Sequence, residues 1–428
     1  MSDADLARGY PDSYYRATAA GLVAPTPLPG DTSAEVCVIG AGYTGLSTAL
    51  HLAEQGVDVV LLEAQRVGWG ASGRNGGQVS SGQRQDEAAL ESSLGPDAAR
   101  AFWKLGQDAK ALVRDLIERH RIDCDLSHGG LVVAHKPALA GELAARAERL
   151  ATHYDYNAMR YVPPEELRRM LAADGFCGGV LDAGAMHLHP LNYALGLARA
   201  CREAGVRLHE QTPVLDYTRG DPTVIRTPRG QVNARHLVVA CNGYLEKLEP
   251  RLAGRIMPIN NIVIATAPLP EPEALIRDRV CVHDTRFVVN YFRLSADGRL
   301  LFGGGETYRR RFPADIAAFV RPYMLRIFPQ LADTAIDYAW GGTLAVTLSR
   351  LPHFGRLAPN LFFAHGFSGH GVPTATLAGR LVAGAIAGDD AGFERFASLP
   401  TRRFPGGTLL RWPGLVAGML WYALRDRL

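Results

Sequence analysis

Two patterns of apolar residues occur along the chain and predict two kinds of domain. Residues 36–39 and 57–62 are apolar runs typical of buried parallel strands, and the segment 44–55 between them carries apolar residues at helical spacing. From 256 to 305, strand patterns follow one another without helices, as in an antiparallel sheet. These strand patterns are 262–266, 280–283, 287–294 and 300–304. The predicted fold class is an α/β domain with a parallel sheet plus an α+β domain with an antiparallel sheet.

Helical patterns divide the chain between these domains. Long helical patterns at 87–119 and 137–152 interrupt the parallel-strand domain, which resumes with a buried strand pattern at 234–240. A strand at 361–365 and a helix at 373–386 complete it. We therefore expect the chain to pass between the two domains several times. The first domain is expected to hold residues 1–90, 181–252 and 339–428, the last part with a C-terminal helix, and the second domain residues 91–180 and 253–338.

The turn after the first strand is rich in glycine and predicts a dinucleotide site. Gly40 permits a sharp turn, Gly42 lets the backbone approach phosphates, and Gly45 lets the helix pack close to the strand. The helix amides would then face a pyrophosphate. Glu63 ends the second strand, near the ~20-residue offset at which a carboxylate accepts hydrogen bonds from a ribose diol. This unit does not distinguish NAD from FAD.

Composition narrows the class of protein. A chain of 428 residues exceeds the size at which one core keeps growing, so two domains are expected. The net charge of +3, with acids and bases interspersed, predicts no nucleic-acid partner. The six cysteines lie far apart without a CxxC pair, which favours reduced buried thiols over disulfides or a metal site. The polar N-terminus lacks the regions of a signal peptide, so a cytoplasmic location is expected.

An apolar segment lies near the C-terminus, at 414–424, with Arg411 before it and Arg425 and Arg427 after it. Its eleven residues are too few to span a bilayer, which needs about 20. Two interpretations stay open. The segment is either a terminal helix docked on the protein or an amphipathic contact with a membrane surface or another subunit.

Four motifs together resemble one family of enzymes. They are the Ser-Tyr-Tyr lead-in at 13–15, the turn at 40–45, the Gly/Ser/Asn-rich block 68–78 and the loop 366–371, Gly-Phe-Ser-Gly-His-Gly. Over nearly the whole chain they are similar to the D-amino-acid oxidase superfamily of FAD enzymes, and most of all to its γ-glutamylputrescine oxidase-like amine oxidases of polyamine catabolism. The resemblance implies a glutathione-reductase-type FAD-binding Rossmann domain and a substrate domain whose antiparallel sheet roofs the flavin.

The resemblance also implies which residues bind FAD. The family counterpart of Glu63 holds the adenosine ribose, the region 70–72 lies along the pyrophosphate and flavin, and Val214 contacts the adenine through its backbone. The residues expected to bind the cofactor are Gly40, Ala41, Gly42, Thr44, Gly45, Glu63, Ala64, Gly70, Ala71, Ser72, Arg74, Asn75, Gly76, Gly77, Gln78, Val214, Gly369, His370, Gly371 and Val372.

The loop 366–371 has chemistry of its own. A glycine loop that opens a helix at about Pro373 presents free amides and a positive dipole end, which would stabilise the negative charge of a reduced flavin. A simple strand-to-helix turn is the alternative. His370 could contact flavin or substrate directly, or act as a hydrogen-bonding scaffold.

Candidate substrate contacts come from the roof sheet and the late loop. Tyr291 and Arg293 alternate on one face of a predicted strand, so both could point at the flavin. Trp340 could line the pocket or only pack, and His370 completes the set. No catalytic residue is named, because a dedicated base is not required when the enzyme binds the free amine.

Two departures from relatives narrow the substrate and the cofactor linkage. Sarcosine oxidases of the superfamily usually carry a lysine that grips the substrate carboxylate two residues after the His-Gly of this loop, where this chain has Pro373. An amine is therefore expected over an amino acid held in that way. No cysteine lies in 341–356, and the block 68–78 lacks the histidine of covalent relatives, so FAD is expected to be non-covalent.

The predicted reaction is oxidation of a C–N bond in a small primary or secondary amine. Hydride passes to flavin N5, the resulting imine hydrolyses to an aldehyde, and O2 is the expected acceptor, giving H2O2. One alternative is an amino-acid or imino-acid dehydrogenase that passes electrons to a quinone. Another is a protein that keeps the nucleotide fold without turnover.

Overall fold

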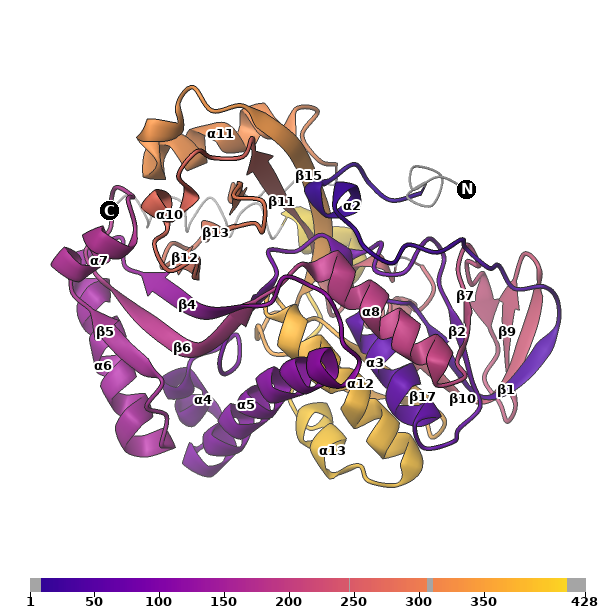
Figure 1. Cartoon of the computed structure of the whole chain (residues 1–428). Coiled ribbons are helices and arrows are strands. Elements are labelled where there is room, and N and C mark those ends of the chain that lie inside the picture. The colour runs from indigo at the N-terminus through magenta and orange to yellow at the C-terminus, as the bar shows by residue number, and fades with distance from the viewer. Residues whose placement is uncertain (1–8, 246, 306–310, 414–428) are drawn as a thin grey trace.

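Two large sheets organise the part of the chain that the computed structural model describes, residues 9–245, 247–305 and 311–413. Figure 1 shows one sheet at the right, beside α3, α8 and α12, and the other at the left, between α6 below and α11 above. The predicted class, α/β plus α+β, is confirmed. The domain boundaries given above stay predictions, although both sheets draw strands from segments far apart in the sequence.

The first sheet contains eight strands in the described residues, in the order β16-β17-β10-β1-β2-β7, with β8 and β9 attached to β10. Its central pairs are parallel, and β16 runs antiparallel to β17 at the edge. Its strands are β1 (Thr32–Ile39), β2 (Val59–Leu62), β7 (Arg207–His209), β8 (Asp216–Tyr217), β9 (Thr223–Thr227), β10 (Gly230–Val239), β16 (His353–Ala358) and β17 (Leu361–His365). All four residues of β2 are buried, as expected for a central parallel strand.

Helices pack on this sheet and on each other. They are α3 (Tyr43–Ala53), α8 (Pro190–Glu203), α9 (Pro250–Ala253), α12 (Gly371–Ala387) and α13 (Ala391–Ala397). A close approach joins α3 to α12, because a Cβ at Gly379 would lie 2.6 Å from the Thr44 carbonyl oxygen. Two glycine-led helices, α3 and α12, thus lie side by side.

The second sheet contains nine strands in the described residues, in the order β15-β11-β14-β13-β12-β4-β6-β3, with β5 attached to β6. They are β3 (Gln78–Val79), β4 (Ser127–Val133), β5 (Met159–Val162), β6 (Gly179–His187), β11 (Met257–Thr266), β12 (Cys281–Asp284), β13 (Tyr291–Leu294), β14 (Leu300–Gly303) and β15 (Ile336–Val346). The sheet is antiparallel except where β4 meets β12. That pair joins distant segments, so no hairpin dictates its direction.

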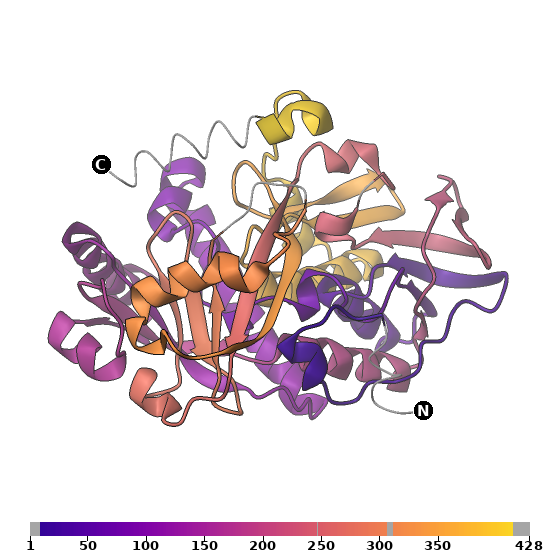
Figure 2. The same ribbon diagram turned by 90° about the horizontal axis from the view of Figure 1, so that it is seen from above.

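Helices α6 and α11 pack against strands of this sheet. Figure 2 shows α11, in orange, lying over the strands of the same colour. The remaining helices are α2 (Tyr14–Ala17), α4 (Glu87–Leu94), α5 (Pro96–Arg119), α6 (Pro137–Tyr154), α7 (Pro164–Met170), α10 (Pro272–Leu275) and α11 (Ile316–Ile327), with 3-10 turns η1 (Ala71–Gly73), η2 (Asn242–Tyr244) and η3 (Pro329–Leu331). The predicted helix at 87–119 is two helices, because Gly95 adopts a φ of +86° before Pro96.

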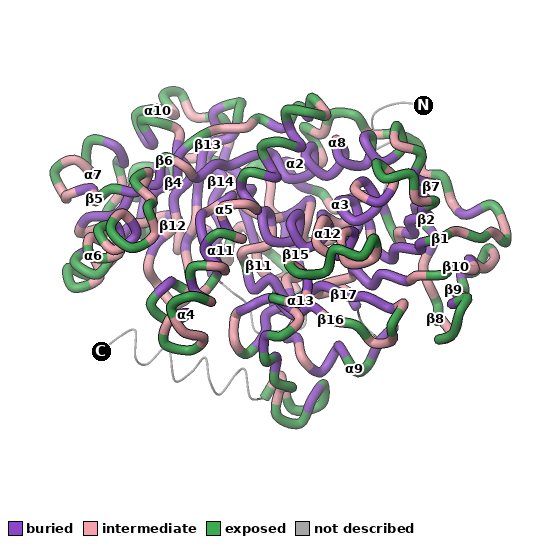
Figure 3. The backbone as a smooth tube through the Cα atoms, turned by 90° about the horizontal axis from the view of Figure 1, so that it is seen from below, coloured by how far each residue is buried: buried purple, intermediate pink, exposed green. Residues whose placement is uncertain are grey.

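The buried residues are concentrated around the two sheets. Figure 3 shows buried backbone concentrated where the sheets meet the central helices, while loop tips are exposed. No helix among the described residues is long and apolar enough to cross a membrane. The apolar segment 414–424, for which two interpretations were left open, lies outside the described residues.

Candidate functional site

The turn between β1 and α3 needs glycine at two positions. Gly40 has a φ of +106°, in the region that favours glycine. A Cβ at Gly45 would overlap the carbonyl oxygen of Gly40, so this first turn of α3 lies directly on the turn before it. A Cβ at Gly42 would lie 2.8 Å from the Ser72 Oγ, which brings the block 68–78 against the same turn. The glycines of this turn therefore let the start of α3, the preceding turn and the block 68–78 pack closely together.

Glu63 lies at the end of β2 and binds this turn. Its Oε2 accepts a hydrogen bond of 2.8 Å from the Ala41 N–H, and its Oε1 accepts one of 2.8 Å from the Gln65 N–H. Burial raises the pKa of Glu63 to about 6, against the opposing effect of these amide donors. The carboxylate retains lone pairs for a further donor, so its role toward a ribose stays a prediction.

Two other predicted contacts of the adenosine half lie at the same edge of the sheet. Ala64 follows Glu63 and is exposed. Val214 is partly buried in the segment that leaves β7, and the Thr212 N–H of that segment donates to the Glu63 carbonyl oxygen at 2.8 Å. The parallel order of β2 and β7 therefore brings Val214 near Glu63, as ribose and adenine contacts would require.

The polar side chains of the block 68–78 bind mostly to the protein's own backbone. Asn75 donates to the carbonyl oxygens of Ala71 and Ser72 at 3.0 and 2.9 Å, and its Oδ1 accepts from the Gly77 N–H at 2.7 Å. The Ser72 Oγ accepts from the Tyr43 N–H at the start of α3, at 3.1 Å. Gln78 donates to the Val282 carbonyl oxygen at 3.0 Å. The block is a braced platform.

Arg74 and Trp340 belong to the same bracing. Arg74 donates from Nε to the Trp69 carbonyl oxygen at 2.6 Å and from Nη1 to the Gly341 carbonyl oxygen at 3.0 Å. The buried Trp340 donates to the Arg74 carbonyl oxygen at 3.1 Å and thereby ties β15 to the block. The Nη2 of Arg74 is buried without a hydrogen-bond partner among the described residues.

Tyr291 and Arg293 share one face of β13, as predicted, and that face meets the block. A Cβ at Gly76 would lie 2.7 Å from the Tyr291 ring. Arg293 is buried and donates to the carbonyl oxygens of Gly76 and Leu188 at 2.8 and 3.0 Å. These carbonyl contacts favour a bracing position for Arg293, whereas Tyr291 is only partly buried. Substrate contact stays a prediction for both.

The loop 366–371 differs from the block in its backbone. Gly366, Ser368 and Gly369 all have positive φ values, of +76°, +53° and +89°. Helix α12 begins at Gly371, two residues earlier than predicted, with His370 as its N-cap residue. Apart from its chain neighbours, no atom of the described residues lies within 4 Å of a Cβ built on Gly369. The first amides of α12 therefore follow directly on a backbone that leaves open space.

His370 is the least satisfied polar group of this loop. Its Nε2 is buried and has no hydrogen-bond partner among the described residues. Burial, assisted by the charge of Arg84, lowers the pKa of His370 to about 4, so the ring is neutral at pH 7. Arg84 also donates to the Ser368 carbonyl oxygen at 3.2 Å and so ties the loop to the segment between β3 and α4.

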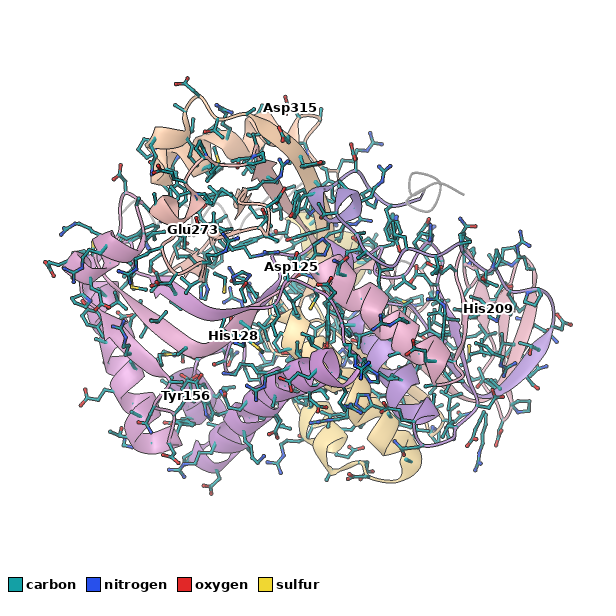
Figure 4. All side chains as sticks on the ribbon, viewed as in Figure 1. Asp125, His128, Tyr156, His209, Glu273 and Asp315 are labelled. Carbon is teal, nitrogen blue, oxygen red and sulfur yellow. The ribbon has the colours of Figure 1, made fainter. Side chains whose placement is uncertain are left out.

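The structure adds polar residues that the sequence analysis missed. Burial and the charge of Arg84 lower the pKa of His283, on β12, to about 4, and His370 contributes to that shift. A buried network lies behind the segment that carries Arg84: Lys110 donates to the Tyr156 hydroxyl at 2.9 Å, and that hydroxyl lies 3.0 Å from the Ser81 Oγ. Figure 4 shows Tyr156 on the α6 side of the second domain. Lone residues in helix and strand patterns carry no signal of such proximity.

The site fits a dinucleotide that carries a flavin. Two helix N-termini with glycine-rich approaches suit anionic groups, one at α3 for a pyrophosphate and one at α12 for a ring that becomes negative on reduction. The buried orphan atoms of Arg74 and His370 await polar partners, as they would in a cofactor or substrate complex. No group of three or more metal-ligating side chains is found in the described part of the chain.

Comparison with known proteins agrees with this geometry. A family model described as FAD dependent oxidoreductase, DAO, matches residues 35–385. The chain is 44% identical over 419 residues to γ-glutamylputrescine oxidoreductase of Escherichia coli K12, covering 97% of this chain and 98% of that protein. It is 39% identical to a probable oxidoreductase, OrdL, of Rhizobium meliloti, covering 99% and 98%.

Solved structures show a similar fold at low sequence identity. Glycine oxidase from Geobacillus kaustophilus matches with a TM-score of 0.72 at 22% identity, over 87% of this chain and 100% of that one. L-proline dehydrogenase from P. horikoshii matches with a TM-score of 0.70 at 21% identity, over 86% and 96%. At these identities the likeness concerns the fold alone.

Proposed function

Because the chain belongs to the DAO family of FAD-dependent oxidoreductases that act on amines, we propose that it oxidises a small amine of the γ-glutamylputrescine type at a C–N bond. The products are an imine, which hydrolyses to an aldehyde, and H2O2 from reduction of O2. FAD is held without a covalent bond, since no cysteine lies in 341–356 and the block 68–78 contains no histidine.

One observation supports an amine substrate independently of family membership. The loop that opens α12 presents a buried, neutral imidazole whose Nε2 is unpartnered in the described residues, on the side where Arg84 and the roof sheet approach. An unprotonated ring nitrogen accepts a hydrogen bond from an amine N–H. Pro373 stands where sarcosine oxidases carry the lysine that grips a substrate carboxylate, so this chain lacks that contact.

The protein's part in the reaction is orientation and exclusion of water. FAD, when bound, supplies the hydride acceptor. The braced block 68–78 keeps the platform rigid, and Tyr291 lies against it with its ring. His370 holds the amine nitrogen by accepting its N–H, which orients the α-carbon for hydride loss and favours the free amine. The low pKa of His370 keeps this acceptor unprotonated throughout the neutral range.

Anaerobic mixing tests the reaction and the substrate class together. Protein that carries FAD is mixed with γ-glutamylputrescine, putrescine, an N-alkyl amine, glycine and proline, and the flavin absorbance is followed. We expect bleaching by the amines and little by the amino acids, with recovery on admission of air and formation of peroxide. Bleaching by amino acids alone, or recovery only with a quinone analogue, would contradict the proposal.

Substitution of His370 tests the assignment of the amine contact. We expect His370→Ala to lower kcat/KM at least about tenfold, which corresponds to the ~1.4 kcal/mol of one hydrogen bond. His153, exposed at the end of α6, provides the matched control His153→Ala. The result would count against the assignment if both variants kept the kcat/KM of the wild type, or if His370→Ala lost its FAD.

A further inference from the structure

A cavity lies at the open edge of the first sheet, away from the site described above. Its volume is about 570 Å³, and residues of β16, α9 and α13 line it, together with Leu399 and Thr401. Figure 3 shows these three elements side by side. Among the described strands, β16 pairs with β17 alone, and its residues 353–357 line the cavity. The volume lies in the range of small-molecule sites, roughly 300–1,000 Å³.

The cavity wall has three arginines, and two of them are paired with carboxylates. Arg251 binds Glu249 with two contacts of 2.9 Å, and Arg356 binds Glu394, so these two cations are neutralised locally. Arg255 has no carboxylate within 4.0 Å among the described residues. Its Nη1 donates only to a backbone carbonyl, that of Thr401. A guanidinium carries five N–H donors, so most of those of Arg255 stay available to a ligand.

A histidine pair lies beside Arg255. The Nδ1 of His353 lies 2.8 Å from the Nε2 of His365, and both rings are buried. His353 also lines the cavity. In the tautomer whose Nδ1 accepts the proton of His365, His353 carries its own proton on Nε2 and so supplies a second donor to the cavity wall. Burial and the charge of Arg255 lower the pKa of His353 to about 4, so the pair adds no competing charge at pH 7.

The rest of the wall is mixed, and the cavity is partly open to solvent. Leu252, Phe354 and Leu399 supply its apolar part, whereas its larger polar part includes Glu394, which is already paired with Arg356. A few convergent donors beside apolar side chains can fix the orientation of a small organic molecule. The donors here complement oxygens that carry negative charge.

We propose that this cavity binds a small organic anion, with its carboxylate or phosphate group on Arg255 and His353. The site does not depend on the proposed reaction. It adjoins the flavin site through one link, because His365 is the last residue of β17 and the loop 366–371 follows it directly. An anion bound to His353 would therefore act, through His365, on the first residues of that loop.

Thermal unfolding of the FAD-loaded protein tests the proposal, with citrate and inorganic phosphate as probes of the two anion types. A ligand that binds only the folded protein raises Tm with the logarithm of its concentration. We expect one probe or both to raise Tm more than sodium chloride of equal ionic strength, and Arg255→Gln to abolish the difference. The control Arg277→Gln removes an exposed arginine of the second domain, paired with Asp278, and should keep the wild-type response.

A second measurement covers the case in which Arg255→Gln fails to fold. The ring resonances of His353 and His365 in the wild-type protein should shift on titration with the probe that raises Tm, while those of the exposed His153 stay unchanged. The proposal is overturned if neither probe exceeds sodium chloride, or if the His353 and His153 rings respond alike. Because no amine turnover is measured, these outcomes are independent of the reaction proposed above.

Discussion

The block 68–78 and the loop 366–371 are both rich in glycine and both lie at the predicted flavin site, yet they use their polar groups in opposite ways. In the block, Ser72, Arg74 and Asn75 bind backbone atoms of the protein itself. In the loop, the Nε2 of His370 is buried without a partner among the described residues, and the space at Gly369 is open. Apart from the Nη2 of Arg74, the polar side chains of the block already have partners in the part of the chain that the structure describes, whereas the loop keeps one buried ring nitrogen, the Nε2 of His370, for a ligand.

This difference shows that a conspicuous polar motif need not be the part that contacts a substrate. Buried polar groups need hydrogen-bond partners, and most of those in the block find them within the protein, which makes the platform rigid. Groups left without partners mark the place where a bound molecule completes the structure. Stability should therefore depend on the block and activity on the loop.

The largest expected contrast is between two glycines with similar backbone angles. Gly77 has a φ of +76°, and a Cβ there would overlap the Leu188 carbonyl oxygen. Gly369 has a φ of +89° but open space around it. We expect Gly77→Ala to yield no folded protein that holds FAD. We expect Gly369→Ala to cost only the left-handed backbone strain, about 1–2 kcal/mol of unfolding free energy.

Urea unfolding and the FAD content of the purified variants measure this contrast. If both variants lost the same unfolding free energy and the same FAD content, the backbone angle alone would determine the cost of substitution. The distinction between a packed platform and an open loop would then be wrong.

Lowering the pH should have the second-largest effect on unfolding free energy. We expect it to affect the loop 366–371, which carries His370, first. Burial lowers the pKa of His283, His353 and His370 to about 4, and that of His187 and His189 to about 3, from an unfolded value near 6.5. A lowered histidine pKa contributes stability that is complete above pH 6.5 and is lost as the pH falls toward the folded pKa. Each ring can remove up to about 1.4 kcal/mol per pH unit in that window.

Glu63 opposes this trend. Its raised pKa of about 6 means that the folded protein takes up a proton before the unfolded chain does, so this one group adds stability between pH 6 and 4.5. The stability lost on protonation of the five histidines exceeds the stability gained from Glu63. We expect unfolding free energy to fall from pH 6.5 to 4, and flavin fluorescence to report release before global unfolding. A flat profile over this window would contradict the expectation.

The smallest of the three effects concerns Asn75. Asn75→Ala removes three hydrogen bonds within the block, and at ~1 kcal/mol each we expect a loss of about 2–3 kcal/mol in unfolding free energy, with weaker FAD binding. Asn157 is exposed, so Asn157→Ala should change stability by less than about 0.5 kcal/mol. Urea titration of both variants compares them, and a similar small loss in each would mean that the block is not a stability element.

The sequence predicted the local parts of the fold well. The strand, turn and helix around Gly40 and Gly45 need only neighbouring residues, because hydrophobic period and backbone sterics act over a few positions. The alternation of parallel and antiparallel regions followed from the order of these patterns. Boundaries were less accurate: the break at Gly95 was missed inside one long apolar period, and α12 begins at Gly371 because His370 ends the loop.

The sequence by itself determined that a glycine turn and a parallel sheet would build a dinucleotide site, since these features depend on residues adjacent in the chain. Only the tertiary structure decided which polar side chains stay free. Arg293 is engaged by Gly76 and Leu188, which come from distant segments, while the Nε2 of His370 meets no such partner among the described residues. Satisfaction of a buried polar group depends on what the fold brings beside it, and residue type and spacing along the chain do not record that.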